Sequence, residues 1–265
     1  MRYVVDHDLH IHSCLSDCSR DPEQTPQAML AYAKQYGLST ICLTDHFWDE
    51  TVDGEVECYR IQNYPHICRS LPLPRAEGVR FLFGCETELN RFLTLGIFRE
   101  RMEELDFIVI PTTHFHFRGE TMFEEELVSA ESRATAWVRR LDGVLNMDLP
   151  FHKVGLAHLT CCAIGADREQ WLRVIEALPE SEMVRLFKKA AALGCGIELN
   201  ADDMTFTDEE TDIALRPYRI AKACGCQFYL GSDAHHPAAL HRAIPVFERA
   251  IDLLGLQESD KFIIK

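Results

Sequence analysis

Short apolar runs rich in β-branched residues alternate with amphipathic helical patterns along almost the whole of this chain. Runs of this kind predict strands, and their alternation with helices predicts a parallel sheet. The strand candidates are residues 3–9, 40–43, 79–84, 107–110, 154–157, 196–199 and 227–230. Seven such units favour a barrel over an open sheet, so an α/β barrel is the expected fold.

The helical patterns have recognisable ends. Thr25 is suited to an N-cap, Pro26 stands at the first helical position, and Gly37 is suited to the C-cap of the same helix. Further helices are expected at residues 124–140, 181–193, 211–223 and 237–254. Strand and helix positions therefore follow from local patterns over most of the chain.

Length and composition predict one globular domain. The 265 residues suffice for a single α/β barrel over residues 1–265, and the apolar share of 47% is typical of globular proteins. No apolar run is long enough for a membrane helix, and the N-terminus lacks signal-peptide features, so a cytoplasmic location is expected. Residues 47–78 contain several prolines together with Trp48, Tyr59 and Tyr64, which predicts an irregular inserted segment that serves as a lid.

Charge and cysteine usage exclude some classes of protein. Nucleic-acid binding requires a basic surface that neutralises phosphates, so the net charge of −15 disfavours a DNA or RNA partner. The 11 cysteines are scattered and fit neither a zinc knuckle nor a secreted disulfide framework. We interpret most of them as reduced, buried, small apolar residues.

Each predicted strand is followed by residues of the types that commonly act as metal ligands. In chain order these are His10 and His12; Asp45 and His46; Glu86 and Glu88; His114 and His116; His158; Glu198 and Asn200; and Asp233, His235 and His236. Because the carboxyl ends of the strands open on one face of a parallel barrel, these side chains are expected to converge. Imidazoles and carboxylates without thiolate suit zinc, manganese or iron(II), and they are too many for one tetrahedral ion. Two to three divalent ions are predicted.

Some of these residues also have an ordinary structural explanation. A single His at a strand end is usually a hydrogen-bonded or surface residue, but placement after all seven strands disfavours chance. Glu198 is either a ligand or a group that supports one. The sequence leaves open whether the remaining candidates touch the site: His7, Glu88, His116, His152 and His241.

The segments DLHIHS, TDH, GCE, TTH, AH and GSDAH occur in this order and together resemble the metal-binding motifs of the PHP (polymerase and histidinol phosphatase) superfamily. The resemblance extends from Asp8 to His241. It implies a distorted (β/α)7 barrel with a trinuclear metal centre, in which Glu86 bridges two ions. The implied ligands are His10, His12, Asp17, His46, Glu86, His114, His158, Asp233 and His235. In several relatives a His at the position of Cys18 takes the place of Asp17.

Adjacent divalent ions suit the hydrolysis of phosphate esters, because they generate hydroxide near neutral pH and stabilise charge on phosphoryl oxygens. We therefore predict a metal-dependent phosphoesterase that hydrolyses a small-molecule phosphate monoester through a metal-activated hydroxide. The chain resembles the histidinol phosphatase branch, so histidinol phosphate is the first expected substrate, although HSCLSDCS lacks the His of that branch's first motif. The alternatives are a metal-dependent phosphodiesterase or nuclease, which the charge disfavours, and a non-catalytic protein that binds metal and a phosphorylated ligand. The sequence does not indicate an oligomeric state.

Further residues are candidates for contact with the substrate. Arg118, which follows His114 in HFHFRG, is the first candidate for a bidentate clamp on the phosphate. Arg20 and Arg168, each expected in a loop after a strand, are the alternatives. His236, Asp45 and a metal-bound water are the candidates for the acid that protonates the leaving group.

Overall fold

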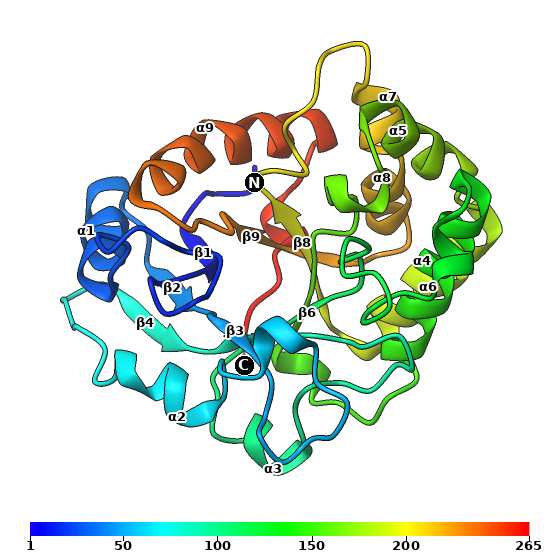
Figure 1. Cartoon of the computed structure of the whole chain (residues 1–265). Coiled ribbons are helices and arrows are strands. Elements are labelled where there is room, and N and C mark those ends of the chain that lie inside the picture. The colour runs from blue at the N-terminus through cyan, green and yellow to red at the C-terminus, as the bar shows by residue number, and fades with distance from the viewer. Residues whose placement is uncertain (265) are drawn as a thin grey trace.

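Parallel strands form the centre of the molecule, and helices surround them. The computed structural model describes residues 1–264. Figure 1 shows long helices around most of the strands, whereas short helices and loops cover the side next to α2 and α3. The strands are β1 (His7–Ile11), β2 (Thr40–Leu43), β3 (His46–Phe47), β4 (Arg80–Phe83), β5 (Cys85–Thr87), β6 (Ile108–Pro111), β7 (Val154–Ala157), β8 (Gly196–Asn200) and β9 (Gln227–Gly231).

The longer helices follow the strands, and all except the last of them, which comes after the last strand, connect one strand to the next. They are α1 (Pro26–Tyr36), α4 (Ala130–Leu145), α5 (Arg168–Ala177), α6 (Glu180–Leu193), α8 (Arg216–Ala223) and α9 (Pro237–Leu254). The short helices are α2 (Tyr64–Ile67), α3 (Arg99–Met102) and α7 (Thr211–Ala214). Single 3₁₀ turns are η1 (Glu57–Tyr59), η2 (Cys68–Ser70), η3 (Glu124–Leu127), η4 (Phe151–Lys153), η5 (Cys162–Ile164) and η6 (Glu258–Asp260).

The strands occupy seven positions around the barrel. One sheet has the order β1-β2-β4 and the other β3-β5-β6-β7-β8-β9, and every pairing is parallel. β2 and β3 are two parts of one interrupted strand, as are β4 and β5. Hydrogen bonds from Gly84 N to Leu43 O and from Glu86 N to Asp45 O continue the pairing across these interruptions. The seven strand positions that the sequence predicts are therefore confirmed.

β1 and β9 meet at the remaining side of the barrel without a regular ladder. Asp233 N donates to His10 O at 2.7 Å, and His12 N donates to Ala234 O at 3.2 Å. Beneath these bonds, the Asp8 carboxylate accepts from Ser232 N. A side-chain acceptor thus replaces a backbone carbonyl between the two strands, and this is the distortion in the (β/α)7 barrel.

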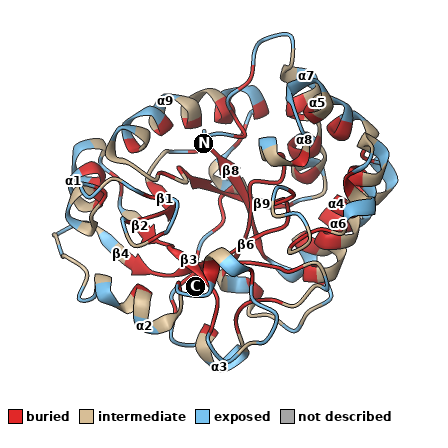
Figure 2. Cartoon of the chain, in the orientation of Figure 1, coloured by how far each residue is buried: buried red, intermediate tan, exposed pale blue. Residues whose placement is uncertain are grey.

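Two layers of apolar side chains cover the two faces of the strands. The larger core lies between strands and helices, and Figure 2 shows buried strands beneath helices whose outer faces are exposed. The smaller cluster fills the barrel interior, and it comprises Leu9, Cys42, Leu82, Phe107, Val109, Ala157, Tyr229, Phe262 and Ile264. The barrel interior is therefore apolar, and polar groups lie beyond it, at the ends of the strands.

Some predicted element boundaries were wrong. The first strand begins at His7 rather than at residue 3, because Tyr3 N bonds to Leu256 O and Val4 N to Glu258, outside the sheet. The helix expected at residues 124–140 is divided into η3 and α4, which Ser129 caps. The helix expected at residues 211–223 is interrupted at Leu215, just before α8 with its proline in the first turn. Helix α5 was not predicted.

Residues 47–78 contain only the end of β3 and the short elements η1, α2 and η2, and their role as an inserted lid stays a prediction. Trp48 and Tyr59 pack with Val56 in a small apolar cluster of their own. Within residues 1–264, no helix is both long and apolar enough to span a membrane.

Candidate metal centre

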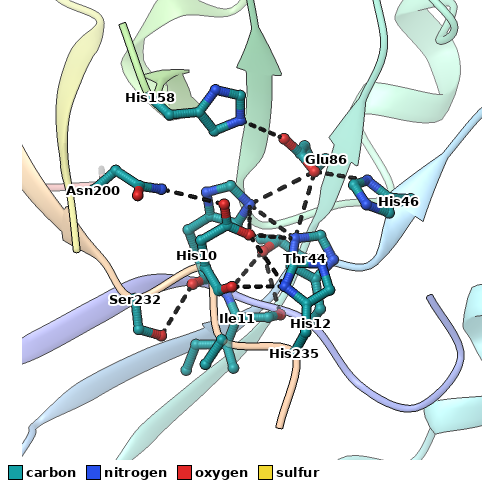
Figure 3. Close-up of polar contacts among 12 residues, drawn as sticks. His10, Ile11, His12, Thr44, His46, Glu86, His158, Asn200, Ser232 and His235 are labelled. Carbon is teal, nitrogen blue, oxygen red and sulfur yellow. Dashed lines mark hydrogen bonds and ion pairs between the residues drawn. The ribbon is translucent and has the colours of Figure 1, made fainter. Parts of the chain in front are cut away.

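Six of the predicted histidine ligands meet at the carboxyl end of the barrel. Figure 3 shows the rings of His10, His12, His46 and His158 directed toward the Glu86 carboxylate. The β1 register shifts between Asp8 and Ile11, which places one extra residue in this strand. Such a bulge re-aims side chains. It allows both His10 and His12 to face the centre, where their Nε2 atoms lie 3.0 Å apart.

The Glu86 carboxylate lies at the middle of these rings and is almost completely buried. Its Oε2 is 2.7 Å from His46 Nδ1, 3.4 Å from His12 Nε2 and 3.7 Å from His10 Nε2. Its Oε1 is 3.0 Å from His158 Nε2 and 4.0 Å from His114 Nε2. Asp233 provides a second carboxylate, with Oδ1 3.1 Å from His12 Nε2. Glu86 is therefore placed to serve two neighbouring sites.

Five rings are oriented by a contact to Nδ1 that leaves Nε2 directed at the centre. The pairs are His10 with Glu198 (2.7 Å), His12 with Ser16 (2.9 Å), His114 with Glu88 (2.5 Å), His158 with Thr113 (3.0 Å) and His235 with the Asp233 carbonyl (2.7 Å). A metal-ligating histidine commonly donates its second ring N–H to such a carboxylate or carbonyl. Glu198 thus lies beside a ligand rather than among the converging nitrogens.

The residues fit divalent ions. Three sets of side chains place ligand atoms within 4.8 Å of one another, and these are His12, His46 and His235; His10, His12 and Glu86; and Glu86, His114 and His158. His46 Nδ1 and Glu86 Oε2 are buried without a hydrogen-bond partner. A buried polar atom without a partner is costly, and a shared cation would satisfy both. Imidazoles and carboxylates are ligands of zinc, manganese and iron(II).

The carboxylates strongly perturb the imidazoles. Burial disfavours the charged form of His158, but the hydrogen bond with Glu86 and the negative charges of the nearby carboxylates together outweigh it and raise the pKa of His158 to about 9. Burial and the neighbouring His235 and His46 rings hold the pKa of His12 well below its usual value. Although burial opposes ionisation, the surrounding imidazoles hold the pKa of Glu86 well below its usual value. The centre therefore retains negative carboxylates that attract cations.

Backbone geometry at the site is specialised. His158 and Asp233 have positive φ angles of 32° and 51°, in a region that side-chain-bearing residues seldom adopt. Strained residues of this kind concentrate at functional sites. Gly231 leaves room for the ion pair between His10 and Glu198, because a Cβ there would lie only 1.9 Å from Glu198 Oε1. Both features support the positions of predicted ligands.

A cavity of about 420 Å³ opens above the cluster. The predicted ligands that line it are Asp17, His46, Glu86, His114, Asp233 and His235, and the other walls come from Cys18, Arg20, Cys58, Tyr59, Gln62, His116 and Phe117. Asp17 is exposed, and its backbone N–H donates to Gln62. Cys18 instead contacts the rings, with Sγ 3.1 Å from His46 Nε2. Burial opposes ionisation of Cys18, but hydrogen bonds with His235 and His46 lower the pKa of its thiol to about 7.

Only one of the three candidate phosphate-binding arginines lines this cavity. Arg20 does so, and within residues 1–264 its side chain forms no hydrogen bond or ion pair. Arg118, the first candidate, is exposed and lies outside the lining. Arg168 was expected in a loop but begins α5, where it pairs with Glu210 and lies 4.0 Å from the Trp171 ring centroid. Arg118 and Arg168 are therefore not among the residues that line the cavity.

Neither of the predicted acid residues reaches the cavity. Asp45 is buried, and its carboxylate accepts hydrogen bonds from Ser13 N, Ser13 Oγ and Ser16 Oγ, which commit it to holding the loop after β1. His236 caps α9, and its Nε2 lies 3.4 Å from Arg242 Nη2. Their role as acids therefore has no support from the cavity lining and stays a prediction.

The residues left open by the sequence divide into two groups. Glu88 orients His114, and His116 and Tyr59 line the cavity, where the Tyr59 ring stacks on His46 at 4.7 Å. His7, His152 and His241 lie outside the cavity lining. Glu88 was detectable as a carboxylate two residues after Glu86. No sequence pattern indicated that Tyr59, alone among the three aromatic lid candidates, lines the cavity.

Sequence comparison agrees with this arrangement. The sequence profile of the PHP domain matches residues 8–202. None of the curated proteins matches the chain in sequence.

Two solved structures share the fold. One is histidinol phosphate phosphatase (HISK) from Lactococcus lactis subsp. lactis Il1403, in complex with zinc, L-histidinol and phosphate. It is 16% identical, with a TM-score of 0.58 over 97% of this chain and 98% of that one. The other is the putative histidinol phosphatase hisK from Listeria monocytogenes, which is 13% identical, with a TM-score of 0.65 over 91% of this chain and 99% of that one.

Proposed function

Because this chain belongs to the PHP domain family, we propose that it is a metal-dependent phosphoesterase that hydrolyses a small-molecule phosphate monoester. The observation that carries the proposal is the position of Glu86, shared by two sets of ligands at the base of one cavity. Sites with neighbouring divalent ions are suited to displacement at phosphorus. The fold shared with a protein that binds zinc, histidinol and phosphate supports the same chemistry.

We assign the ions to the side chains that converge in the structure. One site uses His10, His12, Glu86 and Asp233; a second uses Glu86, His114 and His158; a third uses His46 and His235. When bound, the ions supply Lewis acidity and lower the pKa of a water so that hydroxide forms near neutral pH. Glu198, Glu88, Ser16 and Thr113 hold the rings in one orientation.

The cavity walls suit a small monoester with a cyclic group. Tyr59 and Phe117 offer aromatic surface, and Arg20 offers an unpaired cation for the phosphate. Histidinol phosphate has both a ring and a phosphate, and we keep it as the first substrate to test. With Asp45 and His236 outside the cavity, we assign protonation of the leaving oxygen to water.

The direct test is phosphate release by protein loaded separately with zinc, manganese or iron(II). The panel contains histidinol phosphate, other phosphate monoesters and a simple aryl phosphodiester. We expect at least one monoester to be hydrolysed, the activity to disappear after chelation and to return when the metal is restored. Hydrolysis of the diester alone, or binding of monoesters without turnover by metal-loaded protein, would contradict the proposal.

Substitution of Arg20 tests which cation binds the phosphate. We expect Arg20→Ala to lower kcat/KM for the best monoester by about 10- to 100-fold, the effect of losing one charge-assisted hydrogen bond. The matched control is Arg118→Ala, which removes an exposed arginine outside the cavity and is expected to change kcat/KM less than about twofold. Steady-state kinetics on both variants show which arginine binds the phosphate. A larger loss of kcat/KM in Arg118→Ala than in Arg20→Ala would assign this role to Arg118.

A further inference from the structure

The loop after β1 brings a thiol to the edge of the imidazole cluster. Cys18 Sγ lies 3.1 Å from His46 Nε2. Cys18 lines the same cavity as these two rings. The sulfur therefore stands where two imidazoles from separate strand ends converge.

The two rings are already arranged as metal ligands. His235 Nδ1 contacts the Asp233 carbonyl at 2.7 Å, which fixes the tautomer and leaves Nε2 as the free donor. His46 is only 8% exposed, and its Nδ1 has no hydrogen-bond partner although it lies 2.7 Å from Glu86 Oε2. This nitrogen faces Glu86, whereas Nε2 of the same ring faces Cys18, so an ion that His46 shares with the thiol would be bound through Nε2.

The carboxylate of Asp17, the residue before Cys18, does not contact the imidazoles. Asp17 is exposed, and its only hydrogen bond within residues 1–264 is from its backbone N–H to Gln62. None of the contacts to the imidazoles of the cluster involves the Asp17 carboxylate. Of the two adjacent candidate ligands, only Cys18 contacts His46, and it lines the same cavity as His235.

We propose that Cys18, rather than Asp17, is the third protein ligand of the ion held by His46 and His235. This inference rests on the proposed function in one respect, because both require metal ions at the imidazole cluster. A thiolate with two imidazoles forms a soft site with an open position. This site is expected to prefer zinc or iron(II) to manganese, whereas the carboxylate-rich sites beside it accept harder ions.

Cobalt(II) provides a readout that is independent of activity. Protein titrated with cobalt(II) is expected to show a near-ultraviolet sulfur-to-cobalt charge-transfer band, because thiolate coordination creates this transition. Cys18→Ser should lose the band together with about one ion per chain. Cys18→His should lose the band but keep the ion, because imidazole can replace thiolate as a ligand.

Two controls distinguish ligation from indirect effects. Cys14→Ser removes an exposed thiol from the same loop and Asp17→Asn removes the adjacent carboxylate, so both variants should keep the band and the ion. A band that is absent from cobalt-loaded parent protein, or that persists in Cys18→Ser, would overturn the inference. Phosphate release from the panel is measured separately, so absence of the band from cobalt-loaded parent protein that still hydrolyses a monoester refutes only the thiolate ligand. A band without hydrolysis refutes only the proposed function.

Discussion

Substitution of Glu86 by glutamine is expected to remove most of the bound metal and to slow phosphate release at least about 100-fold. The side chain keeps its size, so the change is one of charge and not of packing. Loss of a group that merely orients a ligand already costs about 10- to 100-fold in affinity or activity, and Glu86 lies at the centre of the ligands themselves.

Electrostatics explain why one residue has this effect. The Glu86 carboxylate faces His10, His12, His46, His114 and His158. An amide cannot neutralise the cations that these rings hold, and its NH₂ group would direct protons toward them. Both sites that share Glu86 are therefore expected to lose affinity together.

The matched control is Glu88→Gln, the same substitution two residues along the chain. Glu88 contacts only His114 among the cluster histidines, so its loss is expected to weaken one site by about 10- to 100-fold and to leave the others filled. Metal content by elemental analysis and kcat under saturating metal are measured for both variants. A full complement of ions in Glu86→Gln would show that the carboxylate is not a shared ligand.

The convergence of the ligands was predictable because it depends on topology. Any parallel barrel brings its strand ends together, so His10, Glu86 and His158 could be grouped from sequence alone, although they are far apart in the chain. The direction of long side chains in loops was not predictable. Arg118 follows a ligand closely but is exposed, whereas Arg20 reaches the cavity from the loop after β1.

Local patterns also missed features that depend on tertiary partners. The extra residue in β1 is set by pairing with β2, and no residue in the segment marks it as a bulge. The resemblance marks the position of Cys18 as one where several relatives have a His, but no local pattern predicts that its thiol contacts His46. Each error concerns a contact between segments that are distant in sequence.

Replacement of Arg140 by methionine is expected to lower the stability of the protein substantially. Arg140 lies in α4, is completely buried, and donates to the carbonyls of Thr112, Thr121 and Leu89 at 2.6–2.8 Å. Burial lowers the pKa of Arg140 to about 10, which leaves it charged at neutral pH. Its Nη2 lies 3.5 Å from Glu88 Oε1.

Methionine fills similar space but leaves these carbonyls without donors and Glu88 without its cation. Removing one partner of a buried charged network costs about 3–5 kcal/mol, so the free energy of unfolding should fall by that amount. For a chain of this size the melting temperature should fall by roughly 10 °C. Denaturant and thermal unfolding of the metal-free protein measure both quantities.

Arg139 provides the control at the adjacent position. It pairs with Glu126 at 2.7 Å with its side chain 31% exposed, so Arg139→Met is expected to cost at most about 1 kcal/mol. If the free energy of unfolding fell equally in the two variants, the hydrogen bonds and charge of Arg140 would not contribute to stability.

Arg140 also links stability to the metal centre. It holds the Glu88 carboxylate that orients His114, and Thr121, whose carbonyl accepts from Arg140, donates its hydroxyl to the His114 carbonyl. Arg140→Met should therefore weaken metal binding at the His114 and His158 site more than at the His46 and His235 site, even where the protein remains folded. Metal titration of folded Arg140→Met at low temperature tests this, and uniform weakening of all sites would argue against the connection. On this physical account, the buried cation in α4 fixes the position of a ligand in the loop after β6.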